Sequence, residues 1–376
     1  MITNNKEWIA DLDIKETKLN DIKAQTTYKI NYVSSYIQKW ILVHLNRPGI
    51  KEIIFVDCMC NAGIYKDGNF ATSMRVLQIF IDAAQHHKDK QFRLFLNDKD
   101  RDKVEIIRMV ADKLLNANPN ENVRVFFQND DVNEYLNDKT IFHRNFDKES
   151  AIVLYVDPYD FGTVNIDILS EFIKNTYCEV IFNFFISDYV RNKIDSRIQA
   201  CIGSVDIQNK EQLVSLIQGR LRVGKMKYSF SYSFKTSTNS ELYQILFITP
   251  NIRGLELLKN TLWDTFDGRE FYQNSNLLPE QISLFSSELD KEMRLEYYSN
   301  EAKEMLLSKF AGRDVSFDEI EIFLMENTML EDTKIIKYIL KPLIAKSMVI
   351  KRNTVDNKNN YNDDIFYFGG LNDADS

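Results

Sequence analysis

Residues 51–68 read KEIIFVDCMCNAGIYKDG, and this stretch decides the fold. Within it, residues 53–56 are a short run of β-prone apolar side chains that ends in Asp57 and a turn of small residues. An apolar run that is continuous rather than alternating is typical of a strand buried on both faces. The stretch therefore predicts one strand of a mainly parallel sheet, with an acidic residue at its carboxyl end.

Four further apolar runs have the same form. They are QFRLFLNDKD at 91–100, NVRVFFQNDD at 122–131, AIVLYVDPYD at 151–160 and CEVIFNFFISD at 178–188. Helical patterns are found at 27–45, 71–87 and 101–116. Strands that alternate with helices predict an α/β fold whose parallel sheet is covered on both faces.

The sequence after these runs predicts a change of direction in the sheet. KYSFSYSF at 227–234 and ELYQILFITP at 241–250 flank the polar stretch KTSTNS, which is typical of an antiparallel hairpin. Residues 189–223 are polar and helix-prone, so they predict a helical insertion before the hairpin. We expect a mainly parallel sheet with a late antiparallel hairpin.

The last eighty residues have a different pattern. Helices are expected at 301–310, 316–326 and 332–346, and strands at 348–351 and 365–368. Ser316 and Glu319 have the spacing of a capping box at the start of the second helix. Pro342 predicts a kink or a break in the third helix, because proline lacks the backbone N–H. Three helices and a two-stranded wing form a winged-helix arrangement.

These patterns divide the chain into four segments. They are a helical lead-in at 1–50, an α/β domain at 51–270, a linker at 271–298 and a winged-helix domain at 299–376. A chain of 376 residues is long enough for such an organisation and for cores that need no disulfide or metal.

The amino-acid composition excludes several classes of protein. Apolar residues make up 44% and charged residues 27%, which excludes a disordered or collagen-like chain. The net charge of −8 leaves no chain-wide basic field for nucleic acid, although a local patch is compatible with it. The four cysteines form no CxxC pair and the four histidines lie outside zinc-finger spacing, so we expect no metal site. The polar N-terminus and the absence of a long apolar run predict a cytoplasmic protein without a membrane span.

Acidic residues follow four of the five predicted parallel strands. They are Asp57, Asp98, Asp130 (with Asp131) and Asp157. Ligands of open α/β sheets bind at the carboxyl ends of the strands, where acids can accept hydrogen bonds from hydroxyls, amines or an ammonium group. The alternative is that these are ordinary solvated loop acids. The loop after Asp57 contains a single glycine, Gly63, and so could not cradle a pyrophosphate as a three-glycine loop does.

Several stretches together resemble one family. Residues 57–68, written D-x-M-C-N-A-G-x-Y-x-D-G, are similar to the D-x-F-A-G-P-G-x-Y-x-D-G segment of the three-Cys-motif partner protein (TcmP) family. Asp157-Pro158-Tyr159 resembles that family's DPYG, and residues 242–264 resemble its late strand and helix. The resemblance extends to an opening helix with a K-x(n)-Y-x(n)-W pattern and to a C-terminal winged helix. The opening pattern corresponds to Lys29, Tyr36 and Trp40.

The resemblance implies a Rossmann-like class I methyltransferase that uses S-adenosylmethionine (SAM). Asp57 and the turn of Cys60, Asn61 and Gly63 would line the methionine end of SAM. Asp98 would accept from the ribose hydroxyls and Asp130 from the adenine amine. Asp157, Pro158 and Tyr159 would form the catalytic, substrate side, similar to the DPPY tetrad of amino-methyltransferases. The family also implies a three-Cys-motif partner that resembles radical-SAM enzymes.

Two departures and one basic cluster leave alternatives open. Asn61 replaces the family's first loop glycine, and Asp160 stands where the family has glycine. These changes favour a non-catalytic binding partner with the methyltransferase fold as a second hypothesis. A metal-dependent nuclease of a defence system is a third. Positive charges on and after the last helix predict contact with nucleic acid, or else a solvated face: Lys334, Lys337, Lys341, Lys346, Lys351 and Arg352.

Overall fold

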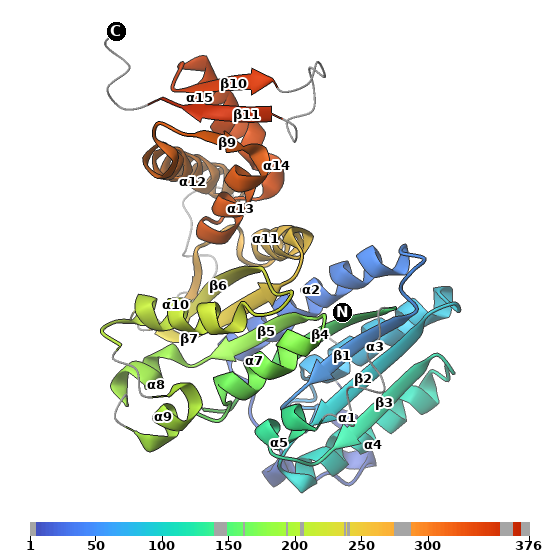
Figure 1. Ribbon diagram of the computed structural model, residues 1–376. Helices are drawn as coiled ribbons and strands as arrows, with labels where there is room; N and C mark the ends of the chain where they lie inside the picture. Colours follow the sequence, from blue (N-terminus) through green and yellow to red (C-terminus); the bar gives the residue numbers. More distant parts are fainter. Residues whose placement is uncertain are drawn as a thin grey trace. The chain divides into compact units, whose positions relative to one another are not determined.

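A computed structural model of the chain is drawn in Figure 1. The structure describes residues 5–138, 149–160, 162–192, 195–203, 207–236, 238, 241–273, 287–353 and 364–369. The chain forms two compact units. The first comprises residues 1–254 and 271–275, and the second comprises residues 255–270 and 276–376.

An eight-stranded sheet organises the first unit. Its order is β3-β2-β1-β4-β5-β7-β6-β8. The strands are β1 (Glu52–Asp57), β2 (Gln91–Asn97), β3 (Val123–Gln128), β4 (Ser150–Val156), β5 (Glu179–Phe184), β6 (Tyr228–Lys235), β7 (Glu241–Thr249) and β8 (Phe271–Gln273). β1 to β5 are parallel, whereas β7 runs antiparallel to both β5 and β6. The predicted parallel strands and the late hairpin are confirmed.

Helices cover both faces of this sheet. They are α1 (Lys6–Asp11), η1 (Glu16–Lys18), α2 (Ala24–Leu45), α3 (Thr72–His86), α4 (Arg101–Ala117), α5 (Val132–Asn137), α7 (Ile166–Asn175), α8 (Ile186–Arg191), α9 (Ser196–Ile202) and α10 (Lys210–Leu221). The helices α2, α3 and α4 pack side by side, and α5, α7 and α10 form a second group (Figure 1). The middle strands β1, β4 and β5 are almost wholly buried, as their continuous apolar runs require.

Polar caps explain where several helices begin. The side chains of Asp100, Asp131 and Asn165 accept hydrogen bonds from the backbone N–H groups at the starts of α4, α5 and α7. Two of these caps lie just beyond the ends of parallel strands. Part of the acidic sequence at the strand ends therefore serves helix capping.

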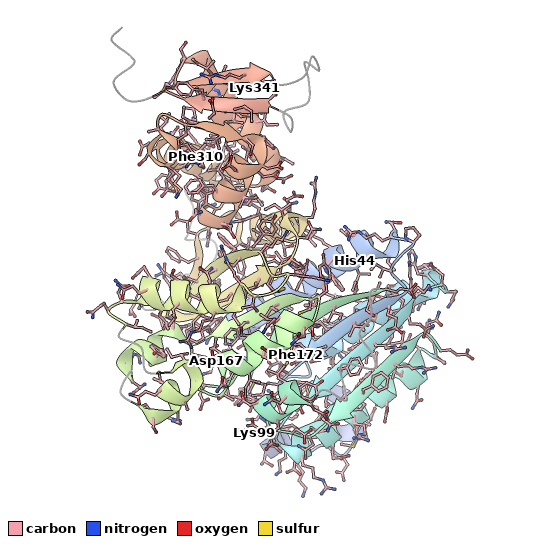
Figure 2. All side chains as sticks on the ribbon, viewed as in Figure 1. His44, Lys99, Asp167, Phe172, Phe310 and Lys341 are labelled. Carbon is pink, nitrogen blue, oxygen red and sulfur yellow. The ribbon has the colours of Figure 1, made fainter. Side chains whose placement is uncertain are left out.

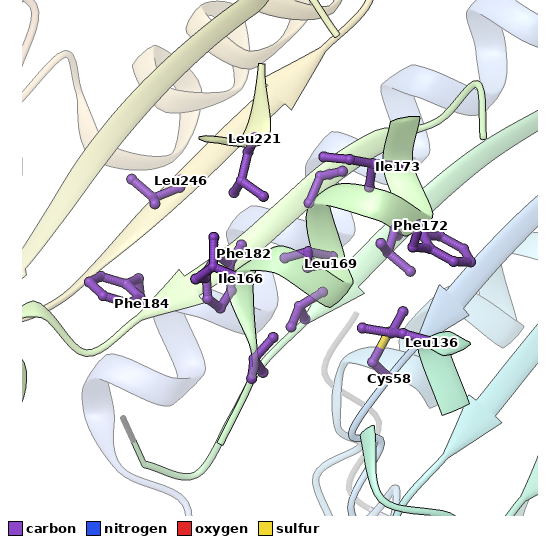
Figure 3. Close-up of a cluster of buried hydrophobic side chains, with 14 of the residues drawn as sticks. Cys58, Leu136, Ile166, Leu169, Phe172, Ile173, Phe182, Phe184, Leu221 and Leu246 are labelled. Atoms are coloured by element: carbon purple, nitrogen blue, oxygen red, sulfur yellow. The ribbon is translucent and has the colours of Figure 1, made fainter. Parts of the chain in front are cut away.

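The core on the α7 face fills the space between that helix and the sheet. Figure 3 shows Leu169, Ile173 and Phe182 in this cluster, with Cys58 beside Leu136. All four cysteines are free and buried. Cys58 is therefore a packing residue.

The second unit contains helices and a small antiparallel sheet. Its elements are α11 (Ile252–Phe266, from Leu255 on), α12 (Ser287–Phe310), β9 (Asp314–Ser316), α13 (Phe317–Asn327), α14 (Asp332–Ile335), η3 (Ile336–Leu340), α15 (Lys341–Ala345), β10 (Val349–Asn353) and β11 (Asp364–Phe368). The sheet order is β10-β11-β9. Ser316 and Glu319 form the predicted capping box at the start of α13.

The boundaries of the units differ from the predicted ones. Most of α11 packs within the second unit, where Lys259 donates to the carbonyl of Thr328 and the indole of Trp263 donates to that of Met329, at 2.6 Å. The segment predicted as a linker contains β8 and the first turns of α12. α12 begins at Ser287, fourteen residues before the predicted start at residue 301.

Pro342 produces a local change of helix type. The backbone keeps right-handed helical angles from Asp332 to Ala345, but η3 is one turn of π-helix directly before α15. Proline cannot donate the usual bond to the carbonyl four residues earlier, and a wider turn makes room for its ring. The expected break is therefore a π-turn rather than an end of the helix.

Candidate active site

The parallel strands of the first unit end at one edge of the sheet, and a cavity lies at that edge. The strand order reverses between β1 and β4, which makes this the switch point where open α/β sheets bind ligands. The cavity has a volume of about 650 Å³, and its wall includes Asp57 from the end of β1 and Asp157 from the end of β4. Lys99, which follows β2, is labelled near this edge in Figure 2.

Asp57 is a buried carboxyl group with two internal donors. It accepts from the backbone N–H of Met59 at 3.1 Å and from the hydroxyl of Ser73 on α3. The pKa of Asp57 is raised to about 7, mainly by burial and to a smaller extent by the nearby charges of Asp157 and Asp98, while its two hydrogen bonds act in the opposite direction. Asp57 therefore changes its protonation state near neutral pH.

The loop after Asp57 uses its own backbone donors internally. The N–H groups of Cys58, Cys60 and Asn61 donate to the carbonyl of Tyr155, the carbonyl of Asn97 and the carboxylate of Asp98, at 2.8–3.0 Å. The N–H of Ala62 donates to the side chain of Asn61 at 2.8 Å. The loop thus presents no unused N–H from residues 58 to 62 to an anionic ligand.

Two residues of this loop take left-handed backbone angles. Asn61 has φ +56° and Gly63 has φ +74°. A Cβ on Gly63 would lie 2.7 Å from Cγ1 of Ile107 on α4. The absence of a side chain at Gly63 therefore allows the loop to pack against α4. Gly63 is not part of the cavity wall, whereas Cys60 and Asn61 are.

Asp98 and Asp130 lie beside a much smaller pocket of about 10 Å³. Asp98 is only 2% exposed, and its two carboxylate oxygens accept from the N–H groups of Asn61 and Asp100, each at 2.9 Å. Asp130 is half-buried and accepts from the amide of Gln128 at 2.6 Å. The structure brings these two acids together, but on the β2–β3 side of the main cavity.

Asp157 is held by three side chains from three elements. The ammonium of Lys29 on α2 lies 2.7 and 2.6 Å from its two oxygens. The amide of Asn183 on β5 donates to it at 2.6 Å, and the hydroxyl of Tyr155 on β4 donates at 3.0 Å. Lys29 is buried, so Asp157 carries its negative charge next to a fixed positive one.

Pro158 and Tyr159 differ in their surroundings. Pro158 is buried at the cavity wall. Tyr159 is 44% exposed and lines both the main cavity and the small pocket. Its hydroxyl accepts from the ammonium of Lys103 at 2.8 Å and lies 3.4 Å from a carboxylate oxygen of Asp98. Tyr159 therefore reaches from the end of β4 to the acids after β2.

The sequence patterns did not reveal four residues of this site. Ser73, Lys103, Tyr155 and Asn183 each bond one of the predicted acids or Tyr159. Tyr155 could have been found, since it lies two residues before Asp157 and so on the same face of β4. Asn183 also carried a signal, because it is the single polar residue in the run VIFNFF. Ser73 and Lys103 lie on helices, and no sequence signal marked them as site residues.

The chain was compared with known protein families, curated proteins and solved structures. No protein-family model matches the sequence, and no curated protein is significantly similar to it. Among solved structures, magnesium protoporphyrin IX methyltransferase from Synechocystis, with bound SAH, is 13% identical (TM-score 0.33); the match covers 65% of this chain and 97% of that one. Spermidine synthase from Thermotoga maritima is 14% identical (TM-score 0.31), and the match covers 66% of this chain and 69% of that one. Geranyl diphosphate C-methyltransferase from Streptomyces coelicolor is 10% identical (TM-score 0.26), and the match covers 57% of this chain and 75% of that one.

Two kinds of feature are absent from the described residues. No group of three or more His, Cys, Asp or Glu side chains there is placed to hold a metal ion. None of the helices in the part of the chain that the structure describes has the length and hydrophobicity to cross a membrane.

The basic residues of the second unit are partly neutralised within the unit. Lys334 lies 3.6 Å from Glu331, Lys351 lies 2.6 Å from Asp364, and Arg352 lies 2.8 Å from Asp314. Three other lysines are exposed on or after the last helix, namely Lys337, Lys341 (labelled in Figure 2) and Lys346.

Proposed function

We propose that the protein is a SAM-dependent methyltransferase whose active site is the cavity between β1 and β4. The observation that carries this proposal is the position of Asp57 and Asp157, which lie at the switch point of a Rossmann-like sheet on the wall of one cavity. A volume of about 650 Å³ falls within the range of about 300–1,000 Å³ found for small-molecule sites.

The residues around the cavity fit SAM in their chemistry. The ligand's ammonium group suits Asp57, whose carboxyl is buried in the wall. Asp98 and Asp130 have lone pairs beyond their present hydrogen bonds and would accept from ribose hydroxyls and the adenine amine. SAM supplies a methyl group on a positively charged sulfur. The chain's own residues then need to orient the acceptor and to exclude water.

The substrate side would consist of Asp157, Pro158 and the residues around them. Lys29 holds the charge of Asp157 in place, so we assign Asp157 to positioning the acceptor rather than to removing a proton. Aromatic rings of Tyr65, Phe185 and Tyr243 on the cavity wall are suited to stacking on a planar group. We infer that the acceptor is a base in a nucleic acid or a modified base.

The second unit and a partner protein complete this proposal. The order of three helices and antiparallel strands supports a winged-helix domain, and Lys337, Lys341 and Lys346 would contact phosphates. The motifs at residues 57–68 and 157–159 support membership of the TcmP family, and with it a three-Cys-motif partner.

A second candidate function is non-catalytic binding by the same fold. It is favoured by the loop after Asp57, where the backbone donors are already used, and by the hydrogen bonds that saturate Asp157. In that case the cavity would hold no SAM. The nuclease hypothesis gains no support from the described residues, where no metal-binding group is found.

Isothermal titration calorimetry with SAM and with SAH separates the two candidates. We expect saturable binding by the wild-type protein and about 2- to 10-fold weaker binding by Asp130→Ala, which loses one hydrogen bond. Asp112→Ala, on the exposed side of α4, is the matched control and should bind as wild type. Absence of binding by a folded wild-type protein would establish the non-catalytic alternative.

A further inference from the structure

Tyr159 lines two spaces that a SAM molecule would have to join. The wall of the main cavity includes Asp57 and Asp157, and the wall of the small pocket includes Asp98 and Asp130. Tyr159 and Met59 line both spaces. A pocket of about 10 Å³ holds one water molecule at most and cannot accept an adenosine group.

The contacts that hold this ring are few and lie near the surface. The Lys103 ammonium bonds the hydroxyl at 2.8 Å and lies 4.1 Å from the ring centroid. The remaining polar contact, to Asp98, is longer, at 3.4 Å. Pro158 restricts the backbone directly before the ring. Tyr159 as a residue is 44% exposed, so part of it already faces solvent.

We propose that Tyr159, held by Lys103, closes the adenosine end of the cofactor site and must rotate away before a nucleoside can reach Asp98 and Asp130. Lys103 is in this sense a positioning residue for cofactor entry. This inference rests on the proposed SAM site. It also revises the expected role of Tyr159, which covers the cofactor side of the site and not only the substrate side.

The closed ring lowers the apparent affinity for the cofactor. When only a fraction of molecules is open, the apparent dissociation constant equals the intrinsic one divided by that fraction. The cation–π contact and the hydrogen bond together favour the closed state. Because each is weak at a half-exposed site, a minor fraction of molecules is still open. Removing the ammonium should therefore tighten SAM binding by roughly 3- to 10-fold.

The experiment uses full-length Lys103→Met and Tyr159→Ala, with two comparison variants. Lys103→Arg keeps a cation and a donor for Tyr159 and should behave as wild type. Arg108→Met removes a charge from the exposed face of the same helix and controls for net charge. SAM affinity is measured by calorimetry, and folding of each variant is checked by thermal melting.

A second readout does not depend on SAM. The thiol of Cys60 lines the main cavity and is 3% exposed, and both Lys103 and Tyr159 lie within electrostatic range of it. Its alkylation by iodoacetamide is followed by peptide mass spectrometry, with Cys201 as the internal reference. Losing the Lys103 charge disfavours the thiolate, so faster labelling in Lys103→Met would report opening of the ring and not a more reactive sulfur.

The two readouts keep this inference distinct from the proposed function. Faster Cys60 labelling together with tighter SAM binding in Lys103→Met and Tyr159→Ala supports the closed-ring proposal. Faster labelling with no SAM binding in any variant retains the closing ring and rejects SAM as the ligand. Unchanged labelling in both variants, or SAM binding that weakens in Lys103→Met but not in Lys103→Arg, overturns the proposal.

Discussion

Lys29 and Asp157 are 128 residues apart in the sequence, and the single ammonium of Lys29 contacts both oxygens of the Asp157 carboxylate. Their side chains are 11% and 22% exposed. The pair ties α2 to the end of β4. It places a positive charge beside Asp157 on a cavity wall that also includes the acid Asp57 and the bases Lys23 and Arg191.

Replacing Lys29 with methionine should destabilise the fold. The variant leaves Asp157 with the donors Asn183 and Tyr155 but without a compensating charge. We expect a loss of about 1–3 kcal/mol, less than for a fully buried pair because water reaches part of Asp157. Urea denaturation at pH 7 measures this loss.

A double variant tests the charge explanation directly. Lys29→Met with Asp157→Asn should be more stable than Lys29→Met alone, because the uncompensated charge is gone. If both variants lose the same stability, the packing of the lysine stem is responsible and the ion pair is not.

Gly63→Ala should be among the most damaging small substitutions in the first unit. The new Cβ would meet Ile107 in a backbone conformation that L-residues rarely adopt. We expect a loss of about 2–4 kcal/mol in the free energy of unfolding.

Gly219 provides the control for this substitution. It lies on the exposed side of α10, and no atom lies within 4 Å of the position that a Cβ would occupy there. Gly219→Ala should raise stability by about 0.5–1 kcal/mol, since alanine favours the helix. A similar effect of both substitutions would contradict the packing argument for Gly63.

The stability of the protein should depend on pH through Asp57. Its pKa is about 7 in the folded chain and about 4 in an unfolded one. The folded state therefore binds more protons between these values, and the stabilisation present below about pH 4 is lost as the pH rises through 7.

Asp57→Asn isolates this contribution, because the amide does not titrate. Relative to the variant, the wild-type protein should lose about 2–3 kcal/mol between pH 5 and pH 8. Glu179, whose buried carboxyl also has a pKa raised to about 7, contributes equally to both proteins. Urea denaturation at several pH values gives the difference, and parallel pH profiles of the two proteins would refute the assignment.

Nucleic-acid binding by the second unit should depend on three lysines. The triple variant Lys337→Gln, Lys341→Gln and Lys346→Gln should reduce the slope of log affinity against log salt by up to about 3 for duplex DNA. The control, Lys334→Gln with Arg352→Gln, removes charges that are already paired within the unit. Equal losses per charge removed in the two variants, measured by fluorescence anisotropy, would show that net charge alone matters.

The sheet could be predicted from the sequence because its signals are local. Continuous apolar runs mark β1, β4 and β5, and polar caps mark the starts of helices. The strand-end acids were also found, and the structure brings them to one edge. Short edge strands such as β8, with three residues, carry no such pattern.

The details of the site could not be predicted, because they depend on contacts between distant elements. The sequence does not indicate that Lys103 would reach Tyr159, 56 residues away, or that Ser73 would bond Asp57. Nor does it indicate that the N–H groups of the loop would be used internally. Such pairings are set by the packing of helices on the sheet, which periodicity alone does not describe.

The path of the chain through α11 constrains how the protein can be divided. Most of α11 belongs to the second unit, but the strand β8 that follows it pairs with β6 in the sheet of the first unit. No single cut in the sequence therefore separates the two units. A C-terminal fragment that starts at residue 287 would lack the donors Lys259 and Trp263 for the carbonyls of Thr328 and Met329. An N-terminal fragment that stops at residue 254 would lose the edge strand. The two units are thus interleaved in the sequence, and the chain passes between them at three junctions, after residues 254, 270 and 275.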